Sequence, residues 1–365
     1  MRIGVPREVK DGEARVGIVP EGVARLVAAG HELVVERGAG RASGYADEAY
    51  AAAGARLFDD ATAIYRAELV VKVKELQPQE WPLLSAGTTL FGFAQLSRDP
   101  ALLDAVLRAR IRYIAYETIA DAAGDLPLLA AMSRIAGRLA PLIAARLLMN
   151  DHGGSGVLLP GVGSVEPGRV VVLGAGNVGG EAAAVATGMG CDVTVFARSA
   201  RRFGALQSRL SRPAQMMICS PELLAPAVAQ ADVIIGAVLE PGRLSPRLLA
   251  RSMVRSMRHG SVLVDVGIDQ GGIAETSRMT QLSAPTYIDE GVIHYCVPNM
   301  PALVPRTATL ALAGATLPYV RVMAARGIQQ ALDEDPGLRA GMQVSDGRIT
   351  HAGLAADAVA SRDRA

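Results

Sequence analysis

Short apolar runs alternate with longer amphipathic stretches along the first third of the chain, and this alternation predicts strands and helices in turn. Helices are expected at 21–29 and 100–109, and Gly30 ends the first of them. Strands that alternate with helices at this spacing form a mostly parallel, doubly wound sheet. The predicted strands of this part are 2–5, 32–36, 68–74, 88–94 and 112–116.

The same pattern returns in the second half of the chain. Residues 129–149 place apolar side chains at helical spacing and predict a long helix, which Pro141 is expected to kink. The glycine-rich segment 153–168 predicts a loop or hairpin between two domains. A further helix is expected from about Thr307. The predicted strands of this part are 169–173, 192–196, 232–239 and 261–267.

The two series together predict an α/β protein of two doubly wound, Rossmann-like domains with a cleft between them. A chain of 365 residues is also too long for a single compact core. We expect the last long helix to cross back to the first domain. The substrate-binding domain is therefore predicted at 1–128 plus 306–365, and the dinucleotide-binding domain at 129–305.

Composition narrows the class of protein. Half of the residues are hydrophobic, a fifth are charged and the net charge is +1, so neither nucleic acid nor an anionic membrane is expected as the main partner. No apolar run approaches the roughly 20 residues of a membrane-spanning helix, and the N-terminus is charged where a signal peptide is apolar. A cytoplasmic location follows. Cys191, Cys219 and Cys296 lack metal-ligand spacing, so we predict buried thiols and no metal site.

Lysine is rare in this chain. Among 37 basic residues only Lys10, Lys72 and Lys74 are lysines. A compact ammonium that can change its protonation state is not replaceable by a guanidinium where a site needs a point donor or an acid. The pair in the segment VKVKE therefore draws attention, although solvated lysines at the end of a strand would explain it equally well.

The turn GAGNVG at 174–179 is the strongest motif. It follows the strand RVVVL and opens an alanine-rich helix, which is the context that gives a G-x-G-x-x-G motif its meaning. Gly174 permits the tight turn, Gly176 lets the backbone approach a pyrophosphate, and Gly179 packs helix on strand. The helix N-terminus attracts the anion. These features predict a bound dinucleotide.

The residues after the next strand bear on which dinucleotide binds. An acidic residue about 20 positions after the glycine turn would bind the 2′-hydroxyl of the ribose, but none stands there. Basic and hydroxyl side chains take its place and could bind a 2′-phosphate, so NADP(H) is predicted over NAD(H), although an ordinary solvated loop has the same composition. The residues at this point are Ala197, Arg198, Ser199, Arg201 and Arg202.

Eight segments spread over the whole chain carry a resemblance to a known family. They are RIGVPREVKDGEARVGIVPEGV, VKVKE, AYET, LPLLAAMS, GAGNVG, IIGAVLEPG, VDVGIDQGG and HYCVPNMPALVPRTAT. With these segments the chain resembles the alanine dehydrogenase family, which is related to the transhydrogenase α-domain. The resemblance implies a nicotinamide cofactor, hydride transfer at the α-carbon of a small amino or imino acid, and a homo-hexamer, with a dimer as the alternative.

The resemblance also implies roles for single residues. Arg15 and Lys74 match the family's contacts to the substrate carboxylate and carbonyl, and Asp269 matches its active-site aspartate. Asn299 and Met300 match the loop that closes over substrate and nicotinamide. Two cations can fix a carboxylate, although each residue alone could be a surface ion pair or a cap. The further matches to cofactor contacts are Ser133, Asn177, Val178, Val238, Leu239 and Arg202.

Two departures from the family stand out. Gln95 occupies the position of the family's catalytic histidine, and Arg134 replaces an acidic residue. Glutamine cannot carry a proton near neutral pH, whereas making and breaking a carbinolamine needs proton transfers worth about 10²–10⁴-fold in rate. Either Lys74, Asp269 or water supplies the protons in a slower alanine dehydrogenase, or the substrate arrives as a preformed imine. His294 is the best histidine to replace the missing one.

The sequence favours the second of these alternatives: an NADP(H)-dependent reductase of an imino acid or another non-alanine substrate. Lys74 or Asp269 would handle the proton and Gln95 would orient the substrate. The alternatives are an ordinary alanine dehydrogenase and a catalytically inactive NADP-binding sensor or scaffold. Retention of Lys74 and Asp269 argues against the inactive form.

Overall fold

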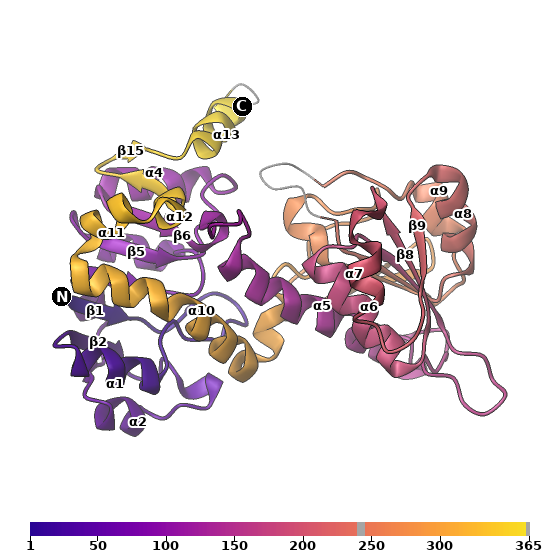
Figure 1. Cartoon of the computed structure of the whole chain (residues 1–365), viewed down its shortest axis with the longest axis horizontal. Coiled ribbons are helices and arrows are strands. Elements are labelled where there is room, and N and C mark those ends of the chain that lie inside the picture. Colours follow the sequence, from indigo (N-terminus) through magenta and orange to yellow (C-terminus); the bar gives the residue numbers. More distant parts are fainter. Residues whose placement is uncertain (239–244, 363–365) are drawn as a thin grey trace. The chain divides into compact units, whose positions relative to one another are not determined.

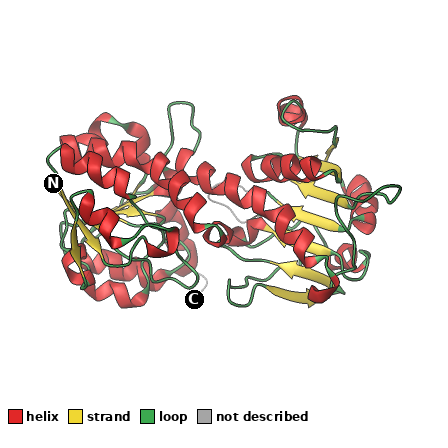
Figure 2. Cartoon of the chain, turned by 90° about the horizontal axis from the view of Figure 1, so that it is seen from below, coloured by secondary structure: helices red, strands yellow, loops and turns green. Residues whose placement is uncertain are grey.

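The computed structural model describes residues 1–238 and 245–362, which form two compact units (Figure 1). Unit 1 comprises Met1–Met132 and Ala302–Ala365, and unit 2 comprises Ser133–Pro301. The first boundary falls inside helix α5 (Pro127–Leu147). Each unit holds a largely parallel sheet with helices on both sides of its strands (Figure 2). The predicted fold class, two doubly wound Rossmann-like domains, is confirmed.

Unit 1 contains an eight-stranded sheet in the order β15-β14-β6-β5-β4-β1-β2-β3. All neighbouring strands pair in parallel except at the β15-β14-β6 edge, where the pairing is antiparallel. Its strands are β1 (Arg2–Val5), β2 (Glu32–Glu36), β3 (Arg56–Phe58), β4 (Leu69–Val71), β5 (Thr89–Gly92), β6 (Arg112–Ala115), β14 (Met342–Ser345) and β15 (Arg348–Ile349). Its helices are α1 (Pro20–Ala28), α2 (Asp47–Ala52), α3 (Ala61–Tyr65), α4 (Pro100–Ala109), α10 (Pro305–Arg326), α11 (Ile328–Glu334), α12 (Pro336–Ala340) and α13 (Ala352–Arg362).

Unit 2 contains a seven-stranded sheet in the order β12-β13-β11-β10-β7-β8-β9, in which only β12 runs antiparallel. Its strands are β7 (Arg169–Leu173), β8 (Asp192–Ala197), β9 (Gln215–Ile218), β10 (Val233–Gly236), β11 (Val262–Asp265), β12 (Thr286–Asp289) and β13 (Val292–Tyr295). Its helices, besides the larger part of α5 from Ser133 onward, are α6 (Asn177–Met189), α7 (Phe203–Gln207), α8 (Pro221–Gln230) and α9 (Arg251–Arg255).

The period of two along the strands of unit 2 explains how both faces of its sheet are covered. In β7, Val170 and Val172 face the apolar side chains of α5 and α6, while Val171 and Leu173 face α8 and α9. A strand buried on both faces reads as a continuous apolar run, as RVVVL does. Helix starts follow local chemistry too, as at α8, where the Ser220 side chain accepts from the Leu223 N–H.

Two helices differ from the expectation that no apolar run approaches membrane-spanning length. Helices α5 and α10 are long and apolar enough by length and composition to cross a bilayer. Ala140 and Ala144 of α5 lie in the core of unit 2, and Leu312 and Val320 of α10 are fully buried. Core helices pass the same test, so the two helices are weak support for a membrane span.

Candidate active site

The glycine turn of unit 2 lies where the strand order reverses, between β7 and the neighbouring β10. Ligands of open α/β sheets bind at such a point, outside the carboxyl ends of the strands. Gly174 follows β7 with φ of +117°, and its N–H donates to the Phe196 carbonyl over 2.8 Å. A Cβ on Gly174 would lie 2.5 Å from the carbonyl oxygen of Ala237, which follows β10. Only glycine fits here.

The other two glycines of the turn differ in what surrounds them. A Cβ on Gly179 would lie 1.8 Å from the Gly174 carbonyl oxygen, so this glycine is needed for helix α6 to pack against the turn. A Cβ on Gly176 would meet only the Arg202 Nη1 atom, at 3.6 Å. Gly176 is thus not required by the fold, and its open side leaves backbone accessible to a ligand. The turn and the N-terminus of the 13-residue α6 fit a pyrophosphate.

The side chains beyond β8 are basic and exposed. Arg198, Ser199 and Arg202 all face solvent, and Arg202 reaches the neighbourhood of Gly176. The chain from Ala197 to Arg202 carries no carboxylate that would repel a phosphate. The structure therefore brings one predicted basic residue, Arg202, to the glycine turn.

The remaining predicted cofactor residues of unit 2 lie in several settings. Asn177 is exposed at the start of α6, and Val178 is half-buried against the hydrophobic core. Ser133 is half-buried on α5, and the carbonyl of Val238 accepts from the Ser245 Oγ over 3.1 Å. Leu239 lies outside the described residues.

The predicted residues near the end of unit 2 are more enclosed. Asp269 is half-buried in the 3₁₀ helix Val266–Gln270, which follows β11 directly. Asn299 is 6% exposed and Met300 only 1%. Met300 packs into the hydrophobic core, so packing alone would account for a methionine there, whereas its contact with a nicotinamide stays a prediction.

His294 is engaged inside the sheet. Its Nε2 lies 2.8 Å from the Thr276 hydroxyl and its Nδ1 lies 2.9 Å from the Val292 carbonyl oxygen. The ring is fully buried and stacks on Tyr287. Burial lowers the pKa of His294. Both ring nitrogens are used in holding β13 and its surroundings, so His294 acts as a structural residue rather than a substitute for a missing catalytic histidine.

The predicted substrate residues of unit 1 also gather where strand order reverses, here between β1 and β4. Lys74 follows β4, Gln95 follows β5, and Arg15 lies in the loop that begins after β1. The ammonium of Lys74 lies 5.7 Å from the centre of the Phe93 ring, two residues before Gln95. The three predicted residues thus follow adjacent parallel strands, β1, β4 and β5, at the carboxyl edge of the sheet of unit 1.

Arg15 is almost completely buried, at 2% exposure. Its Nε donates to Glu13 Oε1 over 2.7 Å, its Nη2 donates to the other oxygen of the same carboxylate, and its Nη1 lies 3.1 Å from the sulfur of Met132. This pairing holds the guanidinium in one orientation. A fixed guanidinium is suited to binding a carboxylate through two parallel hydrogen bonds.

Lys72 and Lys74 are buried, at 1% and 6% exposure, so the alternative of solvated lysines at a strand end is wrong. The strand predicted at 68–74 ends at Val71 instead. The Lys72 ammonium donates to Glu8 over 3.1 Å and to Glu80 over 2.7 Å. Burial alone would lower the pKa of Lys72, but Glu8 and Glu80 raise it above its usual value. Lys72 is therefore a structural cation.

Lys74 is held differently. Its ammonium lies 3.4 Å from Glu75 Oε2, and the other oxygen of Glu75 accepts from the Lys10 ammonium. Burial alone would raise the pKa of Glu75, but Lys74 and Lys10 lower it overall. Lys74 is thus a buried cation that one carboxylate links to a second, more exposed cation.

Gln95 adopts an unusual backbone conformation with φ of +47°. The carboxylate of Glu117 holds this conformation by accepting from the N–H groups of Ala94 and Gln95, over 3.0 and 2.9 Å. Burial raises the pKa of Glu117, and the two backbone donors oppose that shift. The half-buried Gln95 side chain is thereby placed by a half-buried carboxylate that follows the neighbouring strand β6.

Sequence reasoning missed Glu13, Glu75 and Glu117, the three carboxylates that orient the predicted residues. Signals for them existed. Glu13 and Glu75 lie within two residues of a predicted cation, and Glu117 is part of the AYET segment that carries the resemblance.

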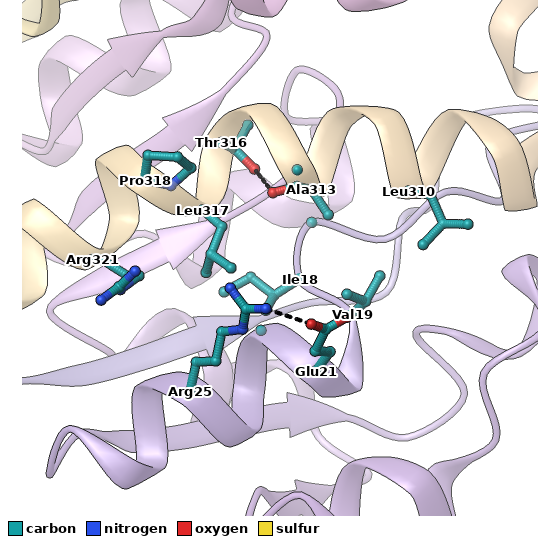
Figure 3. Close-up of a pocket in the computed structure, with 13 residues that line it drawn as sticks. Ile18, Val19, Glu21, Arg25, Leu310, Ala313, Thr316, Leu317, Pro318 and Arg321 are labelled. Carbon is teal, nitrogen blue, oxygen red and sulfur yellow. Dashed lines mark hydrogen bonds and ion pairs between the residues drawn. The ribbon is translucent and has the colours of Figure 1, made fainter.

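A separate pocket of about 230 Å³ lies between α1 and α10 (Figure 3). Ile18 and Leu317 supply its apolar lining, and Arg25 pairs with Glu21 at its edge. None of the predicted site residues is among the 13 that line it. We place the candidate active site at the strand ends and not in this pocket.

These features define a class of protein. A dinucleotide-type turn stands at the switch point of one Rossmann-like unit, and buried cations stand at the switch point of the other. This is the design of a dinucleotide-dependent oxidoreductase that acts on a small acid.

Comparison with known proteins identifies the family. Residues 4–136 match the alanine dehydrogenase/PNT N-terminal domain and residues 140–352 match the alanine dehydrogenase/PNT C-terminal domain. The chain is 46% identical to an alanine dehydrogenase of Halomonas elongata over 97% of this chain and 96% of that protein. It is 44% identical to one of Bacillus subtilis, with 98% and 94% covered. A solved L-alanine dehydrogenase superposes with a TM-score of 0.95 at 44% identity, covering 99% of each chain. The chain belongs to the alanine dehydrogenase/PNT family.

Proposed function

We propose that this protein is an L-alanine dehydrogenase, which reversibly converts alanine, water and an oxidised nicotinamide dinucleotide to pyruvate, ammonium, the reduced dinucleotide and a proton. The observation that carries this proposal is the 46% identity to a named alanine dehydrogenase along nearly the whole chain, combined with buried Arg15 and Lys74 in unit 1. The relatives favour this activity over the imine reduction that the sequence alone favoured.

The proposed roles follow from the chemistry of each group. Arg15, oriented by Glu13, binds the substrate carboxylate. Lys74 donates a hydrogen bond to the carbonyl oxygen of pyruvate or to the hydroxyl oxygen of the carbinolamine. Gln95 orients the substrate through its amide, which both donates and accepts. Asn299 would contribute a further polar contact. Lys74 is proposed to exchange the proton with the substrate, and Asp269 of unit 2 is the alternative for this role.

The cofactor is proposed to rest on unit 2. Gly174, Gly176, Asn177, Val178 and Gly179 would hold the pyrophosphate, and Ser133, Val238, Leu239, Asp269 and Met300 are the further contacts that we propose. When bound, the nicotinamide accepts or supplies the hydride. The exposed Arg198, Ser199 and Arg202 support a preference for NADP(H) over NAD(H), because they offer donors to a 2′-phosphate and no opposing carboxylate.

Cofactor titration tests this preference. NADPH is expected to bind the wild type more tightly than NADH, and Arg198→Ala should weaken NADPH alone. A matched control is Arg56→Ala, which removes an exposed arginine of unit 1. Equal affinity of the wild type for NADH and NADPH would contradict the proposal.

Reduction of a preformed imine is the second candidate, and Gln95 is the observation that favours it. An imine needs no carbinolamine chemistry, so a residue that cannot titrate suffices at this position. Comparing pyruvate plus ammonia with cyclic imino acids as substrates separates the two candidates. Efficient amination of pyruvate supports the alanine dehydrogenase, whereas turnover of cyclic imino acids alone supports the imine reductase. Absence of turnover with both would support a sensor or scaffold.

Two further properties are proposed, the oligomeric state and the location in the cell. The resemblance implies a homo-oligomer, a hexamer or alternatively a dimer, and sedimentation would test it. We also propose a cytoplasmic location, since a small amino acid and a nicotinamide cofactor are both available there.

A further inference from the structure

All three lysines of the protein lie in one region of unit 1, near the carboxyl ends of β1 and β4. Every other basic residue is an arginine. Two of the three, Lys10 and Lys74, share one carboxylate, that of Glu75, with one oxygen assigned to each ammonium. A residue type that the rest of the chain avoids is therefore retained at both ends of a single ion-pair chain.

Exposure changes steadily along this chain. The side chains of Lys10, Glu75 and Lys74 are 25%, 12% and 7% exposed. Solvent therefore reaches Lys10 readily and Lys74 hardly at all. Glu75 joins the two by accepting a hydrogen bond from Lys10 and by an ion pair with Lys74, which makes a route of closely spaced ionisable groups from the more exposed Lys10 to the predicted substrate site.

The identity of the cations matters for what such a route can do. An arginine would preserve both ion pairs, but its guanidinium does not give up a proton in proteins. A lysine ammonium can. The other polar groups near the Lys74 end are committed, since Glu117 accepts from the backbone at residues 94 and 95 and Glu13 pairs with Arg15.

We propose that Lys10 and Glu75 relay protons between bulk water and Lys74. This inference rests on the proposed function, in which alanine, oxidised dinucleotide and water give pyruvate, ammonium, reduced dinucleotide and one proton. The Lys74 ammonium passes its proton to the Glu75 carboxylate, and the amine so formed takes the proton that the substrate releases. Lys10 releases its own proton to water and takes the one held by Glu75. Each group then regains its starting protonation state, and the reverse sequence supplies a proton for amination.

Lys72 is a control built into the same region. It is fully buried between Glu8 and Glu80, and Glu80 in turn accepts from the Tyr65 hydroxyl. Nothing in that network is as exposed as Lys10. Lys72 should therefore hold its proton without exchange through Glu75.

Isotope labelling of the lysines tests, without any turnover, whether Glu75 couples the ammonium groups of Lys10 and Lys74. A protein with carbon-13 at lysine Cε has only three signals, which Lys10→Arg and Lys74→Arg assign. Replacing Glu75 by glutamine removes the charge between the two outer ammonium groups, so their titration midpoints should fall by about 1 pH unit or more, with that of Lys72 unchanged. If the Lys10 and Lys74 midpoints stay in place, the proposal is overturned.

Turnover tests the relay itself. Lys10→Arg preserves the ion pair with Glu75 but cannot pass a proton, so kcat should fall about tenfold while KM for alanine is unchanged. High concentrations of a small buffer such as imidazole should restore kcat. The matched control is Arg56→Lys at the exposed pair with Glu32, which should leave both constants unchanged. A wild-type kcat in Lys10→Arg overturns the relay. A wild type that oxidises no alanine overturns the proposed function instead, and the labelling experiment then decides the linkage.

Discussion

Replacing Gly176 by alanine tests whether the turn at 174–179 holds a pyrophosphate. The added Cβ meets only Arg202, at an ordinary contact distance of 3.6 Å, and the backbone of Gly176 is extended with φ of −82° and ψ of −161°. Alanine adopts this conformation readily, so the free energy of unfolding should change by less than about 1 kcal/mol. The new methyl group occupies the space through which a phosphate oxygen would approach the backbone. A hydrogen bond to a charged group contributes about 1.5–3 kcal/mol, so the dinucleotide Kd should rise roughly 10- to 150-fold.

Gly179→Ala should behave in the opposite way. Its Cβ would overlap the Gly174 carbonyl oxygen at 1.8 Å, and backbone on both sides would have to move. Overpacking of this kind costs about 1–3 kcal/mol, or more where backbone shifts. For a domain of this size the Tm should fall by roughly 2–12 °C.

Both variants are measured by thermal unfolding and by fluorescence titration with NADPH and NADH. Gly204→Ala is the matched control, because a Cβ there has no neighbour within 4 Å. Weakened dinucleotide binding in Gly176→Ala with an unchanged Tm supports a pyrophosphate bound against the turn at 174–179. Wild-type affinity in Gly176→Ala would refute the reasoning, since a ligand resting on the turn could not avoid the new methyl group.

Three further predictions concern unit 1. Gln95→His places a titratable ring at a left-handed position that histidine tolerates, so kcat for alanine should rise by up to about 10²-fold with a new pH dependence near 6.5, and an unchanged pH profile would count against the proposed site. Lys72→Met leaves Glu8 and Glu80 buried without their cation and should cost about 3–5 kcal/mol in denaturant unfolding; a loss below 1 kcal/mol would contradict the structural role. Burial raises the pKa of Glu117, so the free energy of unfolding of the wild type should fall as pH rises above about 4.5. Glu117→Gln lacks this titration and should gain stability relative to the wild type over that range. A difference that is constant with pH would contradict this prediction.

Much of the fold follows from local sequence. Buried parallel strands read as short apolar runs, and the strands found at 2–5, 32–36 and 169–173 coincide with the predicted ones. Strands β14 and β15 were not predicted, because they have only four and two residues, and because β14 depends on pairing with β6, more than 200 positions away, while β15 pairs with β14. Long-range pairing leaves little trace in a short segment.

The burial of the lysines could not be read from the segment VKVKE. Alternating polar and apolar residues are typical of a half-exposed strand, but the strand ends at Val71 and Lys72 enters a network with Glu8 and Glu80. Those partners lie 64 positions before it and eight after it. Local periodicity cannot indicate that two separate segments will supply carboxylates to one ammonium. Only the folded sheet brings them together.

The arrangement around Gln95 narrows the source of the proton. Gln95 itself does not titrate, and Arg15 keeps its proton. Glu117 accepts from two backbone N–H groups, so protonating it would weaken the contacts that hold Gln95 in place. Lys74 is then the group of this site that can exchange a proton without disturbing the backbone, and its ammonium lies beside the carboxylate shared with Lys10. Of the three lysines in this chain, Lys10 and Lys74 therefore stand where the proposed acid–base chemistry needs an ammonium that can lose and regain a proton.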